Sequence, residues 1–452
     1  MGDFQDFMGS YTVNNSNNNK VIFHIDVNSA FLSWSAVKRL REDPNALDLR
    51  TVPSAVGGDV ESRHGIITAR SIPAKKYGIK TADPVVKALQ KCPNLILIPS
   101  DFKTYREYSK AFIAILEKYG TEVEQVSIDE AFLDMTGTEY LFADEIKNGD
   151  NFPICAARKI KDEIRDTLGF TVNVGISTNK LLAKMASDFQ KPDKIHTLYL
   201  NEIKDKMWPL PIGDLFGCGK RTANKLMQLG IRTIGDAAVM DIAVLKGYLG
   251  ENSGAYIHNA ANGISYSEVS SVREKAKSYS NETTTSVDIT ASNYEQLLPP
   301  EIDWLSESVS RRMTRDHVRA NTVTIIVKTN DFKRHTRQTK LPYSINDADT
   351  IKAVASALFT ELLTGTSGLF YQGLGLRLIG VGCSGLDDED SRQLDLFDWM
   401  SAKKQIDENK ENEAKEKARI EASQEKQKKL EEMLSKLKSK YGDDIIKKGD
   451  SE

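Results

Sequence analysis

Two strand patterns in the first third of the chain carry carboxylates at their ends. The apolar run Val21–Ile25 predicts a buried strand, and Asp26 follows it directly before a turn and a helical pattern. Asp129 and Glu130 stand between the two apolar runs of a predicted hairpin, where adjacent negative charges repel each other unless a cation neutralises them. The fold must therefore place acidic side chains beside buried strands.

Both acidic motifs also have ordinary structural explanations. An Asp after a strand can cap the next helix, and an acidic pair at a hairpin is usually a solvated turn. Carboxylate oxygens are the ligands that Mg²⁺ takes, and three of them on neighbouring strands could hold two ions for a phosphoryl transfer. Because Asp26, Asp129 and Glu130 fall within one α/β unit, we interpret them as catalytic, metal-binding carboxylates.

The segment Asn173–Pro192 predicts a strand, a glycine turn and a helix that carries Lys180, Lys184 and Lys191. A solvated lysine face is the ordinary interpretation of such a helix. Lys191, however, stands directly before the proline at the helix end, where a lysine is better placed to point inward and meet phosphates.

A glycine-rich turn in a helical part of the chain predicts contact with a nucleic-acid backbone. Gly217 and Gly219 precede Lys220, and a Leu-Gly-Ile turn at residues 229–231 completes a helix-hairpin-helix pattern. Glycines let backbone N–H groups approach a phosphate without a side-chain clash, and such contacts hold DNA without reading its sequence. An ordinary turn between two helices is the alternative.

The net charge of −3 hides a separation of charge along the sequence. Residues 305–342 hold nine Lys or Arg against three Asp or Glu, a local charge of +6. Basic and polar strands suit a duplex backbone, whereas ordinary solubility is the weaker explanation. We therefore predict DNA contacts by Lys333, Arg334, Arg337 and Lys340.

Two features follow residue 386. The segment Gln393–Phe397 is a short apolar plug in a charged stretch, and it predicts either a docking peptide or a contact with the preceding domain. Residues 401–452 carry 14 Lys or Arg and 13 Asp or Glu in 52 positions. This composition predicts a charged helical tail, which is either solvated or partner-binding.

The composition excludes several classes of protein. Hydrophobic residues make up 40% and charged residues 28% of the 452 positions, and no apolar run approaches the ~20 residues of a membrane-spanning helix. The polar N-terminus lacks the apolar region of a secretory signal. The four cysteines lie far apart, which argues against a disulfide scaffold or a zinc site. We expect a cytoplasmic protein with no membrane partner.

At these motifs the chain resembles the Y-family translesion DNA polymerases, of the bacterial DNA polymerase IV and polymerase V catalytic-subunit type. The resemblance covers about residues 21–386. It implies an α+β multidomain, right-hand polymerase with a ferredoxin-like palm, small fingers, a helical helix-hairpin-helix thumb and a β-α-β-β-α-β little finger. The implied parts are a disordered tail (1–20), the palm (21–37 and 101–198), the fingers (38–100), the thumb (199–270), a linker (271–278), the little finger (279–386), a clamp-binding peptide (387–400) and the charged tail (401–452).

The resemblance also implies roles for single residues. The three carboxylates and the carbonyl of Val27 bind two Mg²⁺ ions in such a polymerase. Phe31 falls at the position where an aromatic ring blocks a ribose 2′-hydroxyl and so selects deoxynucleotides. Lys191 falls on the lysine that contacts the incoming triphosphate.

The finger segment at residues 71–78 departs from the family pattern at two positions. Ile72 stands where the family has a tyrosine that touches the triphosphate. Lys75 stands where it has an arginine, so the positive charge is kept but the bidentate fork is lost. This departure concerns nucleotide affinity more than the type of reaction.

By the same resemblance, Gln393, Leu394, Leu396 and Phe397 match the peptide by which bacterial polymerases bind the sliding clamp. The expected function is error-prone translesion synthesis by a monomer whose partners are primer-template DNA, dNTP and the clamp. A catalytically silent family member, acting as a DNA- and clamp-binding accessory, is the alternative. A palm-fold nucleotide cyclase would leave the helix-hairpin-helix pattern and the basic strands unexplained.

Overall fold

The computed structural model describes residues 20–58, 65–147 and 151–388, and it divides into two compact units between Lys275 and Ala276. Among these residues no helix is both long enough and apolar enough to cross a membrane.

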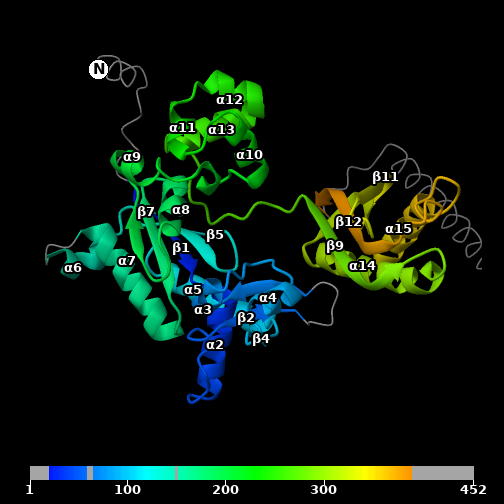
Figure 1. Ribbon diagram of the computed structural model, residues 1–452, viewed down its shortest axis with the longest axis horizontal. Helices are drawn as coiled ribbons and strands as arrows, with labels where there is room; N and C mark the ends of the chain where they lie inside the picture. The colour runs from blue at the N-terminus through cyan, green and yellow to red at the C-terminus, as the bar shows by residue number, and fades with distance from the viewer. Residues whose placement is uncertain (1–19, 59–64, 148–150, 389–452) are drawn as a thin grey trace, which may run out of the picture. The chain divides into compact units, whose positions relative to one another are not determined.

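A five-stranded sheet forms the centre of the first unit, in the order β5-β6-β1-β7-β8 (Figure 1). β1 runs antiparallel to β6 and to β7, and β8 runs parallel to β7. Because β1 is the central strand, it is buried along its length except at Asp26, which is half-buried. The strands are β1 (Ile22–Val27), β5 (Glu122–Gln125), β6 (Glu130–Asp134), β7 (Val172–Ser177) and β8 (Ile195–Thr197).

Helices cover both faces of this sheet. The odd-numbered residues of β1, such as Phe23 and Ile25, share one core with α2 (Ala30–Glu42), α5 (Phe102–Leu116) and α7 (Phe152–Glu163). The opposite face is covered by α8 (Lys180–Asp188). The short helices η2 (Glu139–Phe142) and α6 (Ala143–Lys147) follow β6, and η3 (Ile164–Leu168) continues α7.

Helix α5 forms as its apolar spacing predicts. Its buried side chains recur every three or four residues, as a helix with one face in a core requires. The side chain of Asp101 accepts a hydrogen bond from the Thr104 N–H at 3.1 Å and so caps the first turn. The predicted inner residues, Tyr105, Tyr108, Phe112, Ile115 and Leu116, are all buried.

The close approach of α8 to the sheet depends on a glycine in β7. A Cβ atom at Gly175 would lie 2.0 Å from the carbonyl oxygen of Ala183 and 2.4 Å from the backbone nitrogen of Ser187. Only a residue without a side chain leaves room for the helix backbone here. The lysines of α8 are thereby brought over the ends of β1 and β6.

A small three-stranded sheet, in the order β3-β2-β4, follows α2. Its strands are β2 (Ser54–Gly57), β3 (Ile67–Arg70) and β4 (Ile96–Ile98), and its helices are α3 (Ile72–Lys76) and α4 (Val85–Lys91). Leu32 and Ala36 of α2 pack against Val56 and Ala69 of this sheet. The small sheet is thus joined to the central sheet through α2.

The rest of the first unit is helical, as predicted for residues 201–262. Its elements are η4 (Leu200–Glu202), α9 (Ile203–Lys206), η5 (Ile212–Asp214), α10 (Lys220–Gln228), α11 (Ile234–Val239), α12 (Ile242–Leu249) and α13 (Glu251–Ala261). Their core includes Leu181, Leu182 and Met185 of α8. Helix α8 therefore packs on both the central sheet and the helical part.

The second unit is a four-stranded antiparallel sheet with two helices in its core, in the chain order β-α-β-β-α-β that the sequence predicts. The strand order is β11-β10-β12-β9. Its elements are β9 (Ser278–Ile289), α14 (Tyr294–Arg315), β10 (Val318–Thr329), β11 (Arg334–Ile345), α15 (Ala348–Leu363) and β12 (Leu376–Asp388).

Candidate functional site

The three predicted carboxylates meet at one end of the central sheet. Asp26 of β1 lies opposite Glu130 of β6 in the antiparallel register. The N–H of Val27 donates to the backbone oxygen of Asp129 at 2.9 Å. Two strands of a hairpin and the central strand therefore end together, as the sequence patterns indicate.

A lysine in the middle of α8 and another just beyond its end contact two of these carboxylates. Lys184 donates to Glu130 Oε2 at 2.8 Å, and its Nζ lies 3.9 Å from Asp26 Oδ2. Lys191 donates to Asp26 Oδ1 at 2.7 Å and to Asp188 at 2.9 Å. The inward direction predicted for Lys191 is thus observed, and Lys184 points inward as well.

A buried histidine supports Glu130 from inside the fold. His24 is fully buried, and its Nε2 lies 3.4 Å from Glu130 Oε2, while its Nδ1 lies 2.8 Å from the hydroxyl of Ser187. Contact with His24 and, after it, with Lys184 lowers the pKa of Glu130 to about 2, although burial opposes this. Glu130 is therefore held as a carboxylate.

Asp129 has the opposite environment. Burial and the nearby charges of Asp26 and Glu130 raise the pKa of Asp129, and a hydrogen bond from the Ser127 hydroxyl at 2.7 Å only partly opposes them. Among the described residues, no lysine or arginine pairs with this carboxylate. A bound cation would relieve the repulsion, so the set of oxygen donors fits a divalent metal such as Mg²⁺.

The carboxylates do not form a complete metal site by themselves. In the part of the chain that the structure describes, no three acidic, histidine or cysteine side chains converge on one point. The physical reason is that Lys184 and Lys191 hold Glu130 and Asp26 as counter-ions. A metal ion that used both carboxylates would have to displace these ammonium groups.

A cavity of about 570 Å³ opens beside Asp26 and Asp129. Ser29 takes a left-handed conformation (φ 50°), which turns the chain sharply from β1 into α2 and places Phe31 in the cavity wall. The ring of Phe31 stacks on that of Tyr105, with centroids 4.6 Å apart and planes 12° apart. This stacking fixes Phe31, which the resemblance places at the sugar of the nucleotide.

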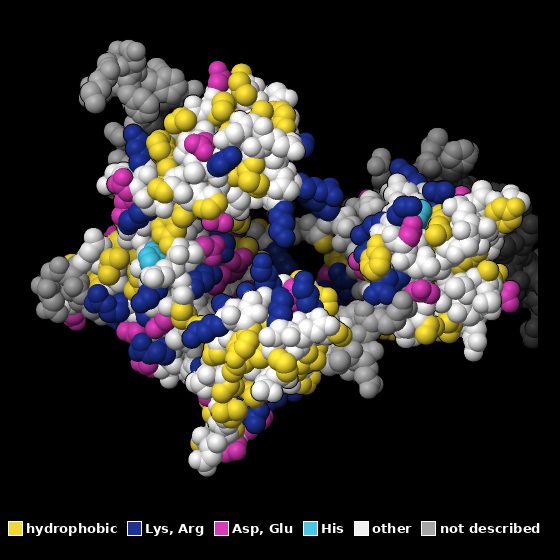
Figure 2. Space-filling model, viewed as in Figure 1, with side chains coloured by type: hydrophobic (Ala, Val, Ile, Leu, Met, Phe, Trp, Pro, Cys, Tyr) yellow, Lys and Arg dark blue, Asp and Glu magenta, His cyan; other side chains and the backbone are white. Residues whose placement is uncertain are grey.

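The small sheet supplies positive charge to the same cavity. Lys75 of α3 lines it, as does Arg70 at the end of β3, and Ile72 is exposed beside them. Partial burial, followed by the charges of Arg70 and Lys191, lowers the pKa of Lys75. Lys and Arg side chains (dark blue) gather near acidic ones (magenta) in this part of the first unit in Figure 2.

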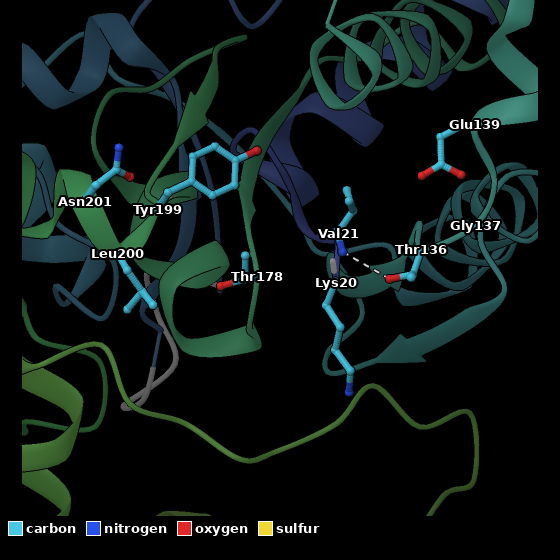
Figure 3. Close-up of a pocket in the computed structure, with 9 residues that line it drawn as sticks. All are labelled: Lys20, Val21, Thr136, Gly137, Glu139, Thr178, Tyr199, Leu200 and Asn201. Atoms are coloured by element: carbon cyan, nitrogen blue, oxygen red, sulfur yellow. Dashed lines mark hydrogen bonds between the residues drawn. The ribbon is translucent and has the colours of Figure 1, made fainter. Parts of the chain in front are cut away.

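A larger cavity, of about 760 Å³, lies at the other end of the central sheet (Figure 3). Its wall holds one carboxylate, Glu139, and the Val21 N–H donates to the hydroxyl of Thr136 at 3.0 Å. Lys20, also in its wall, is paired with Glu268 at 2.8 Å. None of the predicted site residues lines this cavity, so the smaller cavity is the candidate site.

The predicted helix-hairpin-helix turn is present in the helical part, although its first helix is only the single turn η5. Gly217 has φ 81°, and a Cβ atom there would lie 2.5 Å from the hydroxyl oxygen of Tyr256. Gly219 is the residue before α10, and Lys220 is exposed at the first position of the helix. Free backbone N–H groups at this end of α10 suit a phosphate.

The predicted basic residues of the second unit lie on and around β11. Arg334 pairs with Lys328 in the register and Lys340 with Thr322, on the face away from the helices. Arg337 pairs with buried Ile325, and its Nε lies 3.9 Å from Glu361 of α15, so it faces the helices. Lys333 lies in the turn before β11 and contacts Asp331 at 3.0 Å.

The remaining predicted residues, Gln393, Leu394, Leu396 and Phe397, lie outside the described residues. Sequence reasoning missed His24, Arg50 and Arg70. A buried strand histidine next to an acidic motif was a usable signal for the first. No spacing or pattern marks the two arginines, because only the folded chain brings them to the cavity.

Comparisons with known proteins agree along the chain. Residues 25–188 match the sequence profile of the impB/mucB/samB family, and residues 276–396 match the profile of that family's C-terminal domain. A Clostridium acetobutylicum protein named DNA polymerase IV is 39% identical over 427 residues, which are 94% of this chain and 97% of that protein. DNA polymerase IV 1 of Bacillus subtilis is 36% identical over 433 residues, 95% of this chain and 92% of that protein.

A solved structure has the same fold. The Y-family DNA polymerase chimera Dbh-Dpo4(243-245)-Dbh superposes with a TM-score of 0.67 and 24% identity, and it covers 81% of this chain and 99% of its own. The α+β multidomain fold predicted from the sequence is confirmed by this likeness.

Proposed function

The chain belongs to the impB/mucB/samB family of Y-family DNA polymerases, and we propose that it adds deoxynucleotides to a primer 3′-hydroxyl during error-prone synthesis across damaged template bases. It is a DNA-directed DNA polymerase, as the resemblance of its motifs to this family predicted. The observation that carries the proposal is one cavity lined by both carboxylates and cationic side chains.

In the proposed reaction the primer 3′-hydroxyl releases its proton to water as its oxygen bonds to the α-phosphorus of a dNTP, and the bond from that phosphorus to the pyrophosphate breaks. Asp26, Asp129 and Glu130, with the carbonyl of Val27, would hold two Mg²⁺ ions, which when bound lower the pKa of the 3′-hydroxyl and stabilise charge on the phosphate. Without a bound metal ion, His24 and Lys184 hold Glu130 as the carboxylate that this role needs.

Other side chains in the wall of the cavity bind the nucleotide. Lys75 and Lys191 neutralise charge on the triphosphate, and Lys191 can leave Asp26 when a metal ion takes that carboxylate. Phe31, fixed by Tyr105, occupies the space that a ribose 2′-hydroxyl would need. The site thereby selects deoxynucleotides by shape.

DNA is held through its phosphates. The N–H groups around Gly217 and Gly219, together with the Lys220 ammonium, bind the backbone at the hairpin turn. Of the basic groups of the second unit, Lys333, Arg334 and Lys340 bind it through charge, and Arg337, which faces the helices, contributes less. None of these contacts reads base sequence, which suits an enzyme that must accept altered templates.

A primer-extension assay tests the reaction. The wild-type chain should extend a primer on undamaged and abasic templates with Mg²⁺ and not with EDTA. Asp129→Asn should lower extension by about 10³-fold or more while leaving DNA binding intact, because the substitution removes a charged metal ligand. Asp134→Asn, at the other end of β6, is the matched control and should retain activity.

Two results would contradict the assignment. Full extension by Asp129→Asn would remove the metal role of this carboxylate. A wild-type chain that binds DNA but never extends a primer would instead support a silent, accessory member of the family.

The segment Gln393–Phe397 is proposed to bind the sliding clamp, with Leu394, Leu396 and Phe397 as apolar anchors. Replacing Leu396 and Phe397 by alanine should abolish the stimulation of extension by added clamp and leave clamp-free extension unchanged. Equal stimulation of both proteins would exclude this role. We propose that the enzyme acts as a cytoplasmic monomer. The mass of the purified chain, measured by sedimentation, tests the monomeric state.

A further inference from the structure

The cavity beside the carboxylates carries more positive charge than its own acidic residues neutralise. Among the described residues, its walls hold four basic side chains, Arg50, Arg70, Lys75 and Lys191, and two acidic ones, Asp26 and Asp129. A concentration of like charge in one cavity is unfavourable unless an anion enters it. The hydrogen-bond and ion-pair partners of each cation show which of them is still able to bind an anion.

Two of the four already have strong partners. Arg50 donates from Nε and Nη2 to the carboxylate of Asp48 at 2.9 Å each, and from Nη1 to the carbonyl oxygen of Gly169 at 2.7 Å. Lys191 donates to Asp26 and Asp188. Their charges are balanced within the protein.

Arg70 has no such balance. Its Nη1 donates to the hydroxyl of Thr81 at 2.7 Å, and no acidic residue in the described part of the chain pairs with its guanidinium. Its Nε is buried without an acceptor. A buried N–H without an acceptor costs free energy. A charged guanidinium whose one partner is a neutral hydroxyl is unfavourable for the same reason.

The position of Arg70 is fixed by its surroundings. It is the last residue of β3, and Ser71 after it caps α3 by accepting a hydrogen bond from the Ala74 N–H at 3.1 Å. The hydroxyl of Thr81, which also lines the cavity, holds the guanidinium from the other side. The strand end, the Ser71 cap and the Thr81 hydroxyl together fix the Arg70 side chain in the wall of the cavity.

We propose that Arg70 binds the triphosphate of the incoming nucleotide, a role that rests on the proposed polymerase function. A guanidinium offers a planar fork that matches two phosphate oxygens, whereas the ammonium of Lys75 is a single point charge. Arg70 thus provides bidentate recognition that neither Lys75 nor apolar Ile72 supplies. In this proposal Arg70 recognises the shape of the phosphate group, and Lys75 contributes positive charge.

The test compares three full-length variants with the wild type in single-nucleotide extension. Arg70→Met removes the charge, and Arg70→Lys keeps the charge without the fork. Lys76→Met removes one charge from an exposed residue of α3 that does not line the cavity, and it is the matched control. Where Arg70→Met fails to fold by thermal melting, Arg70→Gln, which keeps a donor for Thr81, takes its place.

The KM for dNTP should rise about 10- to 100-fold in Arg70→Met and by a smaller factor in Arg70→Lys, with kcat changed less than about threefold, because a charge-assisted contact to the ground state is lost. Inorganic tripolyphosphate, which has no sugar or base, should bind the wild type and Lys76→Met equally in calorimetry. It should bind Arg70→Met at least about tenfold more weakly.

An unchanged KM and unchanged tripolyphosphate affinity in Arg70→Met would overturn the inference, as would a fall in kcat alone. Because tripolyphosphate binding is measured without DNA, it separates this inference from the proposed function. If the wild type binds tripolyphosphate through Arg70 but does not extend primers, the polymerase proposal is wrong and the anion site is still supported.

Discussion

Replacing Lys184 by methionine should destabilise the metal-free protein and make its stability more sensitive to Mg²⁺. Lys184 reaches Glu130 at 2.8 Å, and the two side chains are only 13% and 21% exposed. Methionine keeps the apolar stem of lysine but removes its charge, so the substitution isolates the electrostatic contact. What is left is a half-buried carboxylate beside two others.

The magnitude follows from the pKa of Glu130. Its fall from 4.5 to about 2 corresponds to about 3 kcal/mol at roughly 1.4 kcal/mol per unit, and the contact with His24 provides the largest part. Lys184 therefore contributes about 1 to 2 kcal/mol to the free energy of unfolding. The value lies below the ~3–5 kcal/mol typical of a broken, fully buried pair because water still reaches Glu130.

Mg²⁺ should offset this loss. In the wild type an ion that uses Glu130 must displace the Lys184 ammonium, whereas in Lys184→Met the carboxylate is free for the ion. Binding to the native state alone stabilises it by RT ln(1 + [L]/Kd), so the variant should gain more from the same Mg²⁺ concentration. The difference between variant and wild type should shrink to less than about half its value in EDTA.

The chain provides a closely matched control one helical turn earlier. Lys180 pairs with Glu124 at 2.7 Å, with exposures of 14% and 27%, and neither residue belongs to the carboxylate cluster. Lys180→Met should lose similar stability in EDTA and regain none of it with Mg²⁺. Any general effect of ionic strength acts on both variants alike.

Scanning calorimetry of the first unit's transition in the full chain, in EDTA and in Mg²⁺ at matched ionic strength, measures the effect. A loss of 1 to 2 kcal/mol corresponds to a fall in Tm of about 2 to 4 °C for a unit of this size. The reasoning is refuted if Lys184→Met melts like the wild type in EDTA, or if Mg²⁺ raises the Tm of both lysine variants equally.

Three further predictions concern the sugar, the α8 contact and DNA. Phe31→Val should raise ribonucleotide incorporation relative to deoxynucleotide by about tenfold or more in extension assays, because the ring in the cavity wall is removed. Gly175→Ala should lower the free energy of unfolding by about 3 kcal/mol or more in thermal melts, because its Cβ would lie 2.0 Å from backbone of α8. Lys340→Ala should lower the slope of log Kd against log salt for DNA by about 1, and Arg337→Ala by less, since Arg337 lies 3.9 Å from Glu361.

Each has an outcome that would contradict it. Unchanged sugar selection in Phe31→Val would remove the ring from the sugar site. Wild-type stability in Gly175→Ala would mean that α8 shifts without loss. A larger slope change for Arg337→Ala than for Lys340→Ala would show that the helix-facing side of β11 binds the duplex.

Most of the architecture was predictable because local signals agreed with the fold. The apolar spacing of residues 348–363 predicts a helix, and it coincides with α15, whose cap is the Asp347 side chain accepting from the Thr350 N–H at 2.8 Å. The sequence pattern also predicts a helix over residues 155–168, whereas the observed helix begins at Phe152 and ends in the wider turn η3. The proline at position 153 made the start of this helix difficult to predict, although proline is favourable in a first helical turn.

The carboxylate cluster was predictable, and its counter-ions were only partly so. Acidic residues at strand ends stand out in a sequence, because they interrupt apolar runs. A lysine on a helix does not, because its direction depends on how closely the helix approaches the sheet. Here that approach is set by Gly175, a residue whose importance lies in a missing side chain.

The basic segment shows why a charge count along the chain overstates a binding surface. Of its nine Lys or Arg residues, the structure gives several to internal contacts: Arg315 pairs with Asp316 at 2.7 Å, and the guanidinium of Arg312 lies over the ring of Tyr279 at 5.3 Å. Strand alternation then sends Arg337 to the side of the helices and leaves Lys340 on the opposite face. Counterion release counts only the charges that reach phosphates. The salt dependence of DNA binding should therefore follow the open face of the sheet and not the +6 of the sequence.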